Sequence, residues 1–155
     1  MKKIAYILSC LLLFAGCNEK PTPEPPVEEV ALGEKVIGEW HCTLSDIEAD
    51  IYLWLMEDQA FELYQKIGDG RYCLYKGTWS ADNATGVLSG KYNDGSLWGS
   101  SYKATVSEDN EHMSLTPEKD ASKEQVYQRC TIPTEIKDSC VIIVKSSGDD
   151  IPAAL

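Results

Sequence analysis

Hydrophobic and polar positions alternate along most of the chain after residue 36. In Gly38 to Leu44, the side chains of Trp40, Cys42 and Leu44 alternate with more polar neighbours, and a period of two residues is typical of a β-strand. Similar segments follow, separated by turn signals such as Asp94-Gly95, a dipeptide that favours tight hairpins. The predicted strands are Gly38 to Leu44, Asp50 to Met56, Ala60 to Ile67, Arg71 to Ser80, Val87 to Asn93, Trp98 to Ser107, His112 to Thr116 and Glu124 to Ile132. About eight short strands at this spacing predict an all-β barrel or sandwich.

The second of these segments differs from the others because both of its faces are apolar. Ile51, Leu53 and Leu55 fall on one face, and Tyr52, Trp54 and Met56 fall on the other. This pattern indicates either a strand that is covered on both sides or an exposed aromatic stripe.

The pattern weakens after Pro133. Thr134 to Asp138 predicts a helical turn and Cys140 to Lys145 a short strand, whereas Ser146 to Leu155 carries no pattern and is interpreted as a loose end.

The N-terminus has the order of a targeting signal. Lys2 and Lys3 precede an apolar run from Ile4 to Phe14, and this run of about 11 residues is too short for a spanning helix, which needs about 20. The small residues before Cys17 in Leu13-Phe14-Ala15-Gly16-Cys17 resemble a bacterial lipobox. The resemblance implies a signal peptide over residues 1–16 and acylation of Cys17, including palmitate. The alternative is an ordinary secretory signal in which Cys17 is an incidental thiol.

Residues 17–35 are rich in proline and glutamate, which favours an extended tether between the lipidated cysteine and the folded domain. A leader with no spacing role is the alternative. Asn18 stands where some Gram-negative lipoproteins carry the Asp that retains them in the inner membrane. We therefore expect the protein in the cell envelope, held by its lipid at the outer membrane.

Charge limits the partners. The chain has a formal charge of -11, which becomes -13 when Lys2 and Lys3 leave with the signal. Nucleic acid needs a basic surface, so the acidic domain is not expected to bind it. The roughly 120 residues from Val36 onward are enough for one compact domain.

Four cysteines remain in this domain, Cys42, Cys73, Cys130 and Cys140, in a compartment where disulfides persist. Sequence alone allows three pairings, or free thiols. The four cysteines form no CxxC pair, and the histidines, His41 and His112, are far apart in the sequence. We therefore expect no metal site and no other cofactor. Nor do the residues form a recognisable catalytic constellation, so an enzyme is not expected.

Two short motifs resemble the lipocalin family. Gly38-Glu39-Trp40 in the first strand is similar to the lipocalin Gly-x-Trp, and Arg129 near the end of the last strand is similar to the lipocalin arginine. Segments around Lys76-Gly77-Thr78-Trp79-Ser80 and Leu88-Ser89-Gly90 also look like small lipocalin-like bacterial lipoproteins. The resemblance implies an antiparallel up-and-down β-barrel over residues 36–137, followed by a tail over residues 138–155.

The resemblance also implies roles for particular residues. Trp40 and Arg129 are expected to close the barrel base through a cation–π contact. With Trp40 and Arg129 inward, strand parity turns Cys42 inward and Cys130 outward, which favours a Cys42–Cys73 bridge and a Cys130–Cys140 bridge. The residues expected to line a pocket for a small apolar or amphipathic ligand are Tyr64, Trp79, Trp98, Tyr102 and Tyr127.

The expected function is therefore a membrane-anchored, lipocalin-like lipoprotein that binds such a ligand. One alternative is a surface interaction module, in which Tyr52, Trp54 and Met56 dock on a glycan or a protein partner. A second alternative is an enzyme inhibitor, or an enzyme, at the cell surface.

Overall fold

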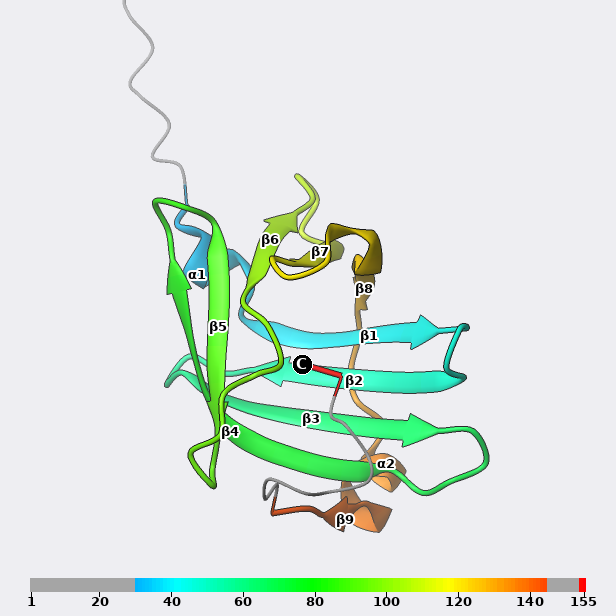
Figure 1. Cartoon of the computed structure of the whole chain (residues 1–155). Helices are drawn as coiled ribbons and strands as arrows, with labels where there is room; N and C mark the ends of the chain where they lie inside the picture. The colour runs from blue at the N-terminus through cyan, green and yellow to red at the C-terminus, as the bar shows by residue number, and fades with distance from the viewer. Residues whose placement is uncertain (1–29, 145–153) are drawn as a thin grey trace, which may run out of the picture.

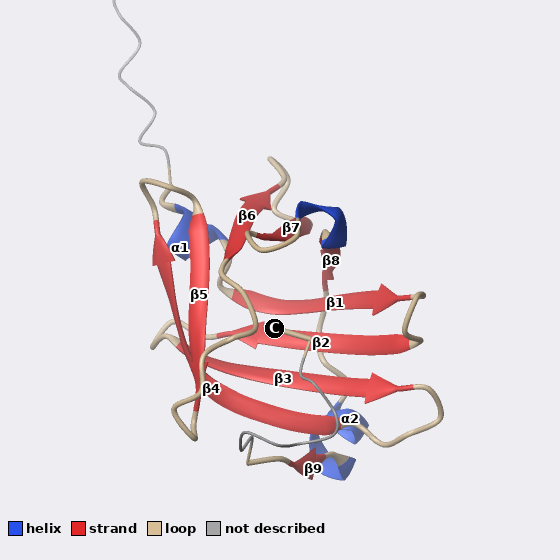
Figure 2. Cartoon of the chain, in the orientation of Figure 1, coloured by secondary structure: helices blue, strands red, loops and turns tan. Residues whose placement is uncertain are grey.

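A computed structural model describes residues 30–144 and 154–155 of the chain. It shows a closed antiparallel barrel of eight strands (Figure 1; Figure 2). The strands follow one another around the barrel in chain order, and the barrel closes where β8 pairs with β1 at Trp40 and Arg129. The barrel strands are β1 (Gly38–Leu44), β2 (Ala49–Leu55), β3 (Ala60–Ile67), β4 (Cys73–Asp82), β5 (Val87–Tyr92), β6 (Tyr102–Val106), β7 (His112–Pro117) and β8 (Gln125–Arg129). The predicted all-β barrel is confirmed.

One end of the barrel is closed by the Gly-x-Trp segment and Arg129. The guanidinium carbon of Arg129 lies 4.1 Å from the centre of the Trp40 ring, which is the expected cation–π contact. The guanidinium also donates hydrogen bonds to the carbonyl oxygens of Lys35, Ile37 and Asn110. A Cβ atom on Gly38, whose φ is +140°, would lie 2.2 Å from Arg129 Nη1, so only glycine fits there.

A short helix completes the closed end. Helix α1 (Leu32–Lys35) lies just before β1, and Gly33 N donates to Asn83 Oδ1 in the loop between β4 and β5. Leu32 packs against the core and Val36 is fully buried. Trp40 Nε1 donates to the Val36 carbonyl at 2.8 Å. Residues 32–35, which the sequence assigns to the tether, therefore belong to the folded unit.

The barrel interior is filled by large side chains. The largest buried ones include Trp40, Phe61, Tyr75, Tyr92 and Tyr127, and several rings meet edge to face, with Phe61 lying 5.3 Å from Trp98 and 5.6 Å from Tyr92 between ring centres. Such pairs stabilise a core beyond the area that they bury. All described core residues lie at or after Leu32, so the segment 30–155 contains a complete barrel and core.

The residues after β8 form a second layer on the outer face. Helix α2 (Thr134–Ser139) and the two-residue strand β9 (Val141–Ile142) match the predicted helical turn and short strand. Strand β9 runs parallel to β4 at Cys73 and Leu74. Beneath α2 lies a small apolar cluster, the outer cluster, made of Tyr64, Leu74 and Ile132 with Tyr52, Trp54, Tyr72, Ile136 and Cys140 packed against it. The second strand is thus covered on both sides.

Two predicted strands are shorter than their sequence patterns suggest. The pattern from Glu124 to Ile132 forms a strand only over Gln125–Arg129. Trp98 to Ser101 belong to the loop between β5 and β6, because Trp98 turns inward and packs over Gly90. A Cβ atom on Gly90 would lie 2.1 Å from Cε2 of Trp98, so the glycine makes this approach possible.

Neither expected disulfide is present, since Cys42, Cys73, Cys130 and Cys140 are all free thiols. Cys42 and Cys73 do share the interior side, but β2 and β3 separate their strands. Each step across a sheet is about 4.8 Å, whereas bridged Cβ atoms lie about 4 Å apart. Cys140 instead directs its thiol to the Lys137 carbonyl at 3.3 Å. Burial raises the pKa of Cys42 to about 12, which leaves this thiol protonated at neutral pH.

In the part of the chain that the structure describes, neither helix has the length and apolar character needed to cross a membrane.

Replacing Arg129 tests the closed end. Arg129→Met removes the cation–π contact and the hydrogen bonds to three carbonyl groups, so we expect the free energy of unfolding to fall by about 2–4 kcal/mol. Urea unfolding followed by tryptophan fluorescence measures the change. Arg71→Met, at an exposed arginine, is the matched control and should shift stability by less than about 0.5 kcal/mol. Equal effects of the two substitutions would contradict the assigned role of Arg129.

Candidate functional site

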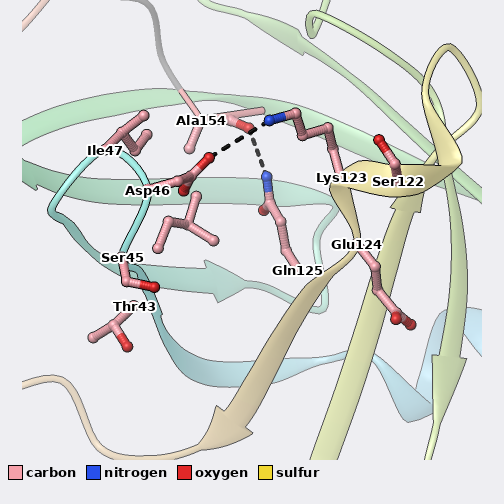
Figure 3. A pocket seen from close by; sticks show the side chains of 10 residues that line it. Thr43, Ser45, Asp46, Ile47, Ser122, Lys123, Glu124, Gln125 and Ala154 are labelled. Carbon is pink, nitrogen blue, oxygen red and sulfur yellow. Dashed lines mark hydrogen bonds and ion pairs between the residues drawn. The ribbon is translucent and has the colours of Figure 1, made fainter.

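A cleft lies at the end of the barrel opposite Arg129. This cleft of about 570 Å³ separates the loop between β1 and β2 from the 3₁₀ turn η1 (Ala121–Lys123) that precedes β8 (Figure 3). An exposed ion pair spans its rim, with Lys123 Nζ 3.6 Å from Asp46 Oδ2, and such pairs add little to stability. The residues that line the cleft are Thr43, Leu44, Ser45, Asp46, Ile47, Ser122, Lys123, Glu124, Gln125 and Ala154.

The last two residues of the sequence form the floor of this cleft and continue into the barrel. Ala154 lines the cleft, whereas the side chain of Leu155 is 1% exposed and belongs to the core. Figure 1 places this end of the chain inside the ring of strands. Burying one leucine side chain stabilises a fold by about 1.5–3 kcal/mol. The open half of the barrel is therefore occupied by a segment from the end of the chain.

Side chains from four strands hold the main chain of these two residues. Gln65 Oε1 on β3 accepts from Ala154 N at 2.6 Å. The Ala154 carbonyl accepts from Gln125 Nε2 on β8 at 3.2 Å and from the Tyr102 hydroxyl on β6 at 3.3 Å.

Further hydrogen bonds involve Leu155 and orient Gln125. The Tyr92 hydroxyl on β5 donates to the Leu155 carbonyl at 2.6 Å, and the Tyr127 hydroxyl donates to Gln125 Oε1 at 2.7 Å. Gln125 is thereby oriented with its amide nitrogen toward Ala154 (Figure 3). Because the Tyr127 hydroxyl holds the other end of this amide, Gln125 is fixed as a donor toward the cleft floor.

The side chains that form this site carry no formal charge. Burial raises the pKa of Tyr102 to about 12 and the pKa values of Tyr92 and Tyr127 further above their ordinary range. The three phenols are therefore hydroxyl donors at any physiological pH. Neutral phenol and amide side chains can form hydrogen bonds with carbonyl and amide groups, and they supply no counter-charge for an ion.

The five aromatic residues expected to line a pocket do not lie together. Trp98, Tyr102 and Tyr127 are inside the barrel, and Trp98 and Tyr102 are 6.1 Å apart between ring centres. Trp79 is also buried in the core, but it borders a smaller cleft of about 220 Å³ beside Gly33 and Ile37 near the closed end.

Tyr64 lies on the opposite side of the sheet from the other four. It belongs to the outer cluster beneath α2, and its hydroxyl donates to Glu62. Parity explains this position, because Phe61 and Leu63 on the same strand point into the core.

Two interior donors have no acceptor among the described residues. The indole nitrogens of Trp79 and Trp98 are buried and form no hydrogen bond there. Buried polar groups normally have partners. Trp98 contacts the ring of Tyr102, whose hydroxyl binds the Ala154 carbonyl.

The histidines lie outside the barrel. His41 Nε2 and Asp50 Oδ1 are 2.6 Å apart and share a hydrogen bond, and Asp50 also accepts from the Tyr72 hydroxyl. Burial raises the pKa of Asp50, but the hydrogen bonds from Tyr72 and His41 outweigh it and leave the pKa below its ordinary value. His112 is exposed on β7. Among the described residues, no three His, Cys, Asp or Glu side chains gather as a metal site would require.

The residues that sequence reasoning missed are the glutamines and the end of the chain. Gln65 and Gln125 are polar residues that are at most 7% exposed. Each lies at an inward position of its strand, two residues from an inward neighbour: Leu63 for Gln65 and Tyr127 for Gln125. A buried polar residue in an apolar face was the available signal. Ala154 and Leu155 gave none.

No family model matches the chain, and no curated protein is significantly similar to it in sequence.

Two tyrosine substitutions test the polar contacts. Tyr92→Phe removes the hydroxyl that donates at 2.6 Å to the Leu155 carbonyl, so we expect a loss of about 1–2 kcal/mol in the free energy of unfolding. Tyr102→Phe, which removes a longer contact of 3.3 Å, is the matched control and should cost about 0.5 kcal/mol or less. Urea unfolding of both variants measures the difference. Equal stability of Tyr92→Phe and the unaltered protein would contradict the contact.

Proposed function

We propose that this protein is a lipid-anchored, lipocalin-like lipoprotein that binds a small amphipathic ligand in the open half of its barrel. The observation that carries the proposal is the environment of Leu155. An aliphatic side chain is enclosed there by the barrel core, while neutral donors and acceptors from four strands bind the polar main chain beside it. A pocket with apolar walls and a few convergent polar groups is the usual form of a small-molecule site.

The arrangement of the cleft supports the same proposal. Ala154 lines the outer cleft of about 570 Å³, and its carbonyl group also accepts a hydrogen bond from Gln125. A ligand in the cleft would meet Gln125 first and the apolar interior next. The uncharged interior favours a ligand whose buried end is apolar or carries a carbonyl group, and Trp98 Nε1 supplies an unused donor for that group.

The alternative of a surface module is less well supported. Its proposed docking stripe was Tyr52, Trp54 and Met56, all of which are half-buried. Tyr52 stacks on His41 at 4.4 Å, and Lys137 Nζ lies over the Trp54 ring at 4.6 Å. Because neighbouring side chains from the same chain already contact these two rings, little of the stripe is left for a glycan or a protein partner.

A brominated fatty acid tests the ligand proposal. Bromine quenches indole fluorescence at contact distance, so 12-bromododecanoate bound in the open half of the barrel of segment 30–155 should quench Trp98, which lies next to Tyr102. Saturable quenching should therefore be lost in Trp98→Phe. Trp54→Phe, on the outer face, is the matched control and should retain it. Absence of saturable quenching, or its loss in Trp54→Phe instead, would refute an internal ligand site.

The anchoring part of the proposal rests on the N-terminal sequence, which lies outside the described residues. Cleavage before Cys17 and its acylation would hold the barrel at the membrane, with the outer membrane the proposed location. The acidic charge of -11 gives the barrel no electrostatic attraction to anionic lipid, so the lipid would carry the attachment.

Replacing Cys17 tests this anchoring. In cells that produce the full chain with radiolabelled palmitate, Cys17→Ser should abolish label incorporation and move the protein from the membrane fraction to the soluble fraction. Cys42→Ser, at a buried thiol of the barrel, is the matched control and should keep both label and fractionation unchanged. Label that persists in Cys17→Ser would overturn the lipobox interpretation.

A further inference from the structure

Ala154 and Leu155 contact the barrel in the way that a bound ligand does, and not as a paired strand. Neither Ala154 nor Leu155 belongs to a described strand or helix, and the Ala154 N–H, the Ala154 carbonyl and the Leu155 carbonyl each form a hydrogen bond with a side chain. Gln65 accepts from the Ala154 N–H, and Gln125 donates to the Ala154 carbonyl. Backbone groups in secondary structure normally pair with other backbone groups, so this pattern is the one found for a molecule held in a pocket.

The contacts also indicate which chemical groups the pocket can bind. The N–H and the carbonyl group of Ala154 and the carbonyl group of Leu155 are bound. The side chain of Leu155 is enclosed at 1% exposure, whereas Ala154 borders the outer cleft. The pocket therefore recognises an amide, then a large aliphatic side chain, then a second carbonyl. At the position of Ala154, the side chain faces a cleft that has room for other groups.

From this arrangement we propose that the open half of the barrel binds peptide-like ligands, in which an amide is followed by a large aliphatic residue, and that Ala154 and Leu155 compete with them. This inference rests on the proposed ligand-binding function and names its ligand class. A ligand and the chain end need the same four side chains, Gln65, Tyr92, Tyr102 and Gln125, so the two cannot bind together. Ala154 and Leu155 are tethered to the barrel, so their effective concentration in the pocket is high and they raise the ligand concentration needed.

The test compares two ligands and two forms of segment 30–155. One form is unaltered, and the other lacks Ala154 and Leu155. The ligands are N-acetyl-Ala-Leu-amide, which supplies an N–H, two carbonyl groups and a leucine side chain in the same order, and N-acetyl-Ala-Asp-amide, which places a charged side chain where that of Leu155 is buried. Isothermal titration calorimetry measures binding. We expect N-acetyl-Ala-Leu-amide to bind the shortened form at least tenfold more tightly than the unaltered form, and N-acetyl-Ala-Asp-amide to bind neither.

A control substitution separates competition from a general change at this end of the chain. Val144→Asp alters an aliphatic side chain that is 73% exposed, and it should leave the affinity of N-acetyl-Ala-Leu-amide as low as in the unaltered form. Leu155→Asp should raise this affinity as the deletion does, because a buried unpaired carboxylate is expelled from an apolar site. Equal affinities in Leu155→Asp and Val144→Asp would overturn the competition.

The outcomes distinguish this inference from the proposed function. If 12-bromododecanoate quenches Trp98 in both forms but N-acetyl-Ala-Leu-amide binds neither, the ligand class is wrong and the ligand-binding function stands. If neither compound binds a shortened form that circular dichroism shows to be folded, both are wrong and Leu155 is only a core residue.

A second variant serves if the shortened form does not fold. Leu155→Ala keeps the main-chain contacts and loses only the aliphatic side chain, at a cost of about 2–5 kcal/mol. N-acetyl-Ala-Leu-amide should then raise its melting temperature in a concentration-dependent manner, and N-acetyl-Ala-Asp-amide should not. Equal effects of the two compounds would overturn the inference.

Discussion

The stacking of the Arg129 guanidinium on the Trp40 ring determines how the rest of this barrel is organised. The contact joins the first and last strands of the barrel. Through its hydrogen bonds to the carbonyls of Lys35, Ile37 and Asn110, the same guanidinium also fixes the N-terminal helix and the loop between β6 and β7. The contact therefore closes this end of the barrel, and the cleft of about 570 Å³ lies at the opposite end.

At the opposite end, Ala154 and Leu155 together fill the interior and supply hydrogen-bond partners for buried polar groups. Gln65 and Gln125 project into a core of aliphatic and aromatic side chains, where an amide without hydrogen bonds is destabilising. Ala154 supplies partners for both, and Leu155 fills the adjacent apolar space. A ligand that displaces them would have to provide equivalent groups, which is why the contacts of these two residues are informative about the ligand.

Much of the barrel could be predicted from local sequence pattern, since strands with a two-residue period carry their own signal. The limits of β1 and β3 agree with prediction, and Gly38, Trp40 and Arg129 indicated the closed end. Features that depend on contacts distant in sequence could not be predicted in this way. The inward turn of Trp98 depends on space over Gly90, and the burial of Leu155 depends on four separate strands.

In the candidate site, too, local sequence pattern predicted some features, whereas features that depend on distant contacts could not be predicted. Strand parity correctly put Cys42 inside the barrel, but parity does not say how many strands separate two cysteines, and both expected disulfides are absent. Tyr64 was included with the interior aromatics although its neighbours Phe61 and Leu63 have the opposite parity. Gln65 and Gln125 are polar residues at inward positions of their strands, and their burial distinguishes them from the surrounding apolar side chains.

The central claim is that Leu155 occupies the ligand site of the barrel and leaves it when a ligand binds. Nuclear magnetic resonance of segment 30–155 with labelled leucine methyl groups measures this directly. The account predicts nuclear Overhauser contacts between the Leu155 methyl protons and the rings of interior aromatic residues in the free protein, and their loss as N-acetyl-Ala-Leu-amide is added. Leu155 methyl signals at solvent-exposed positions in the free protein, or interior contacts that persist at saturating ligand, would contradict it.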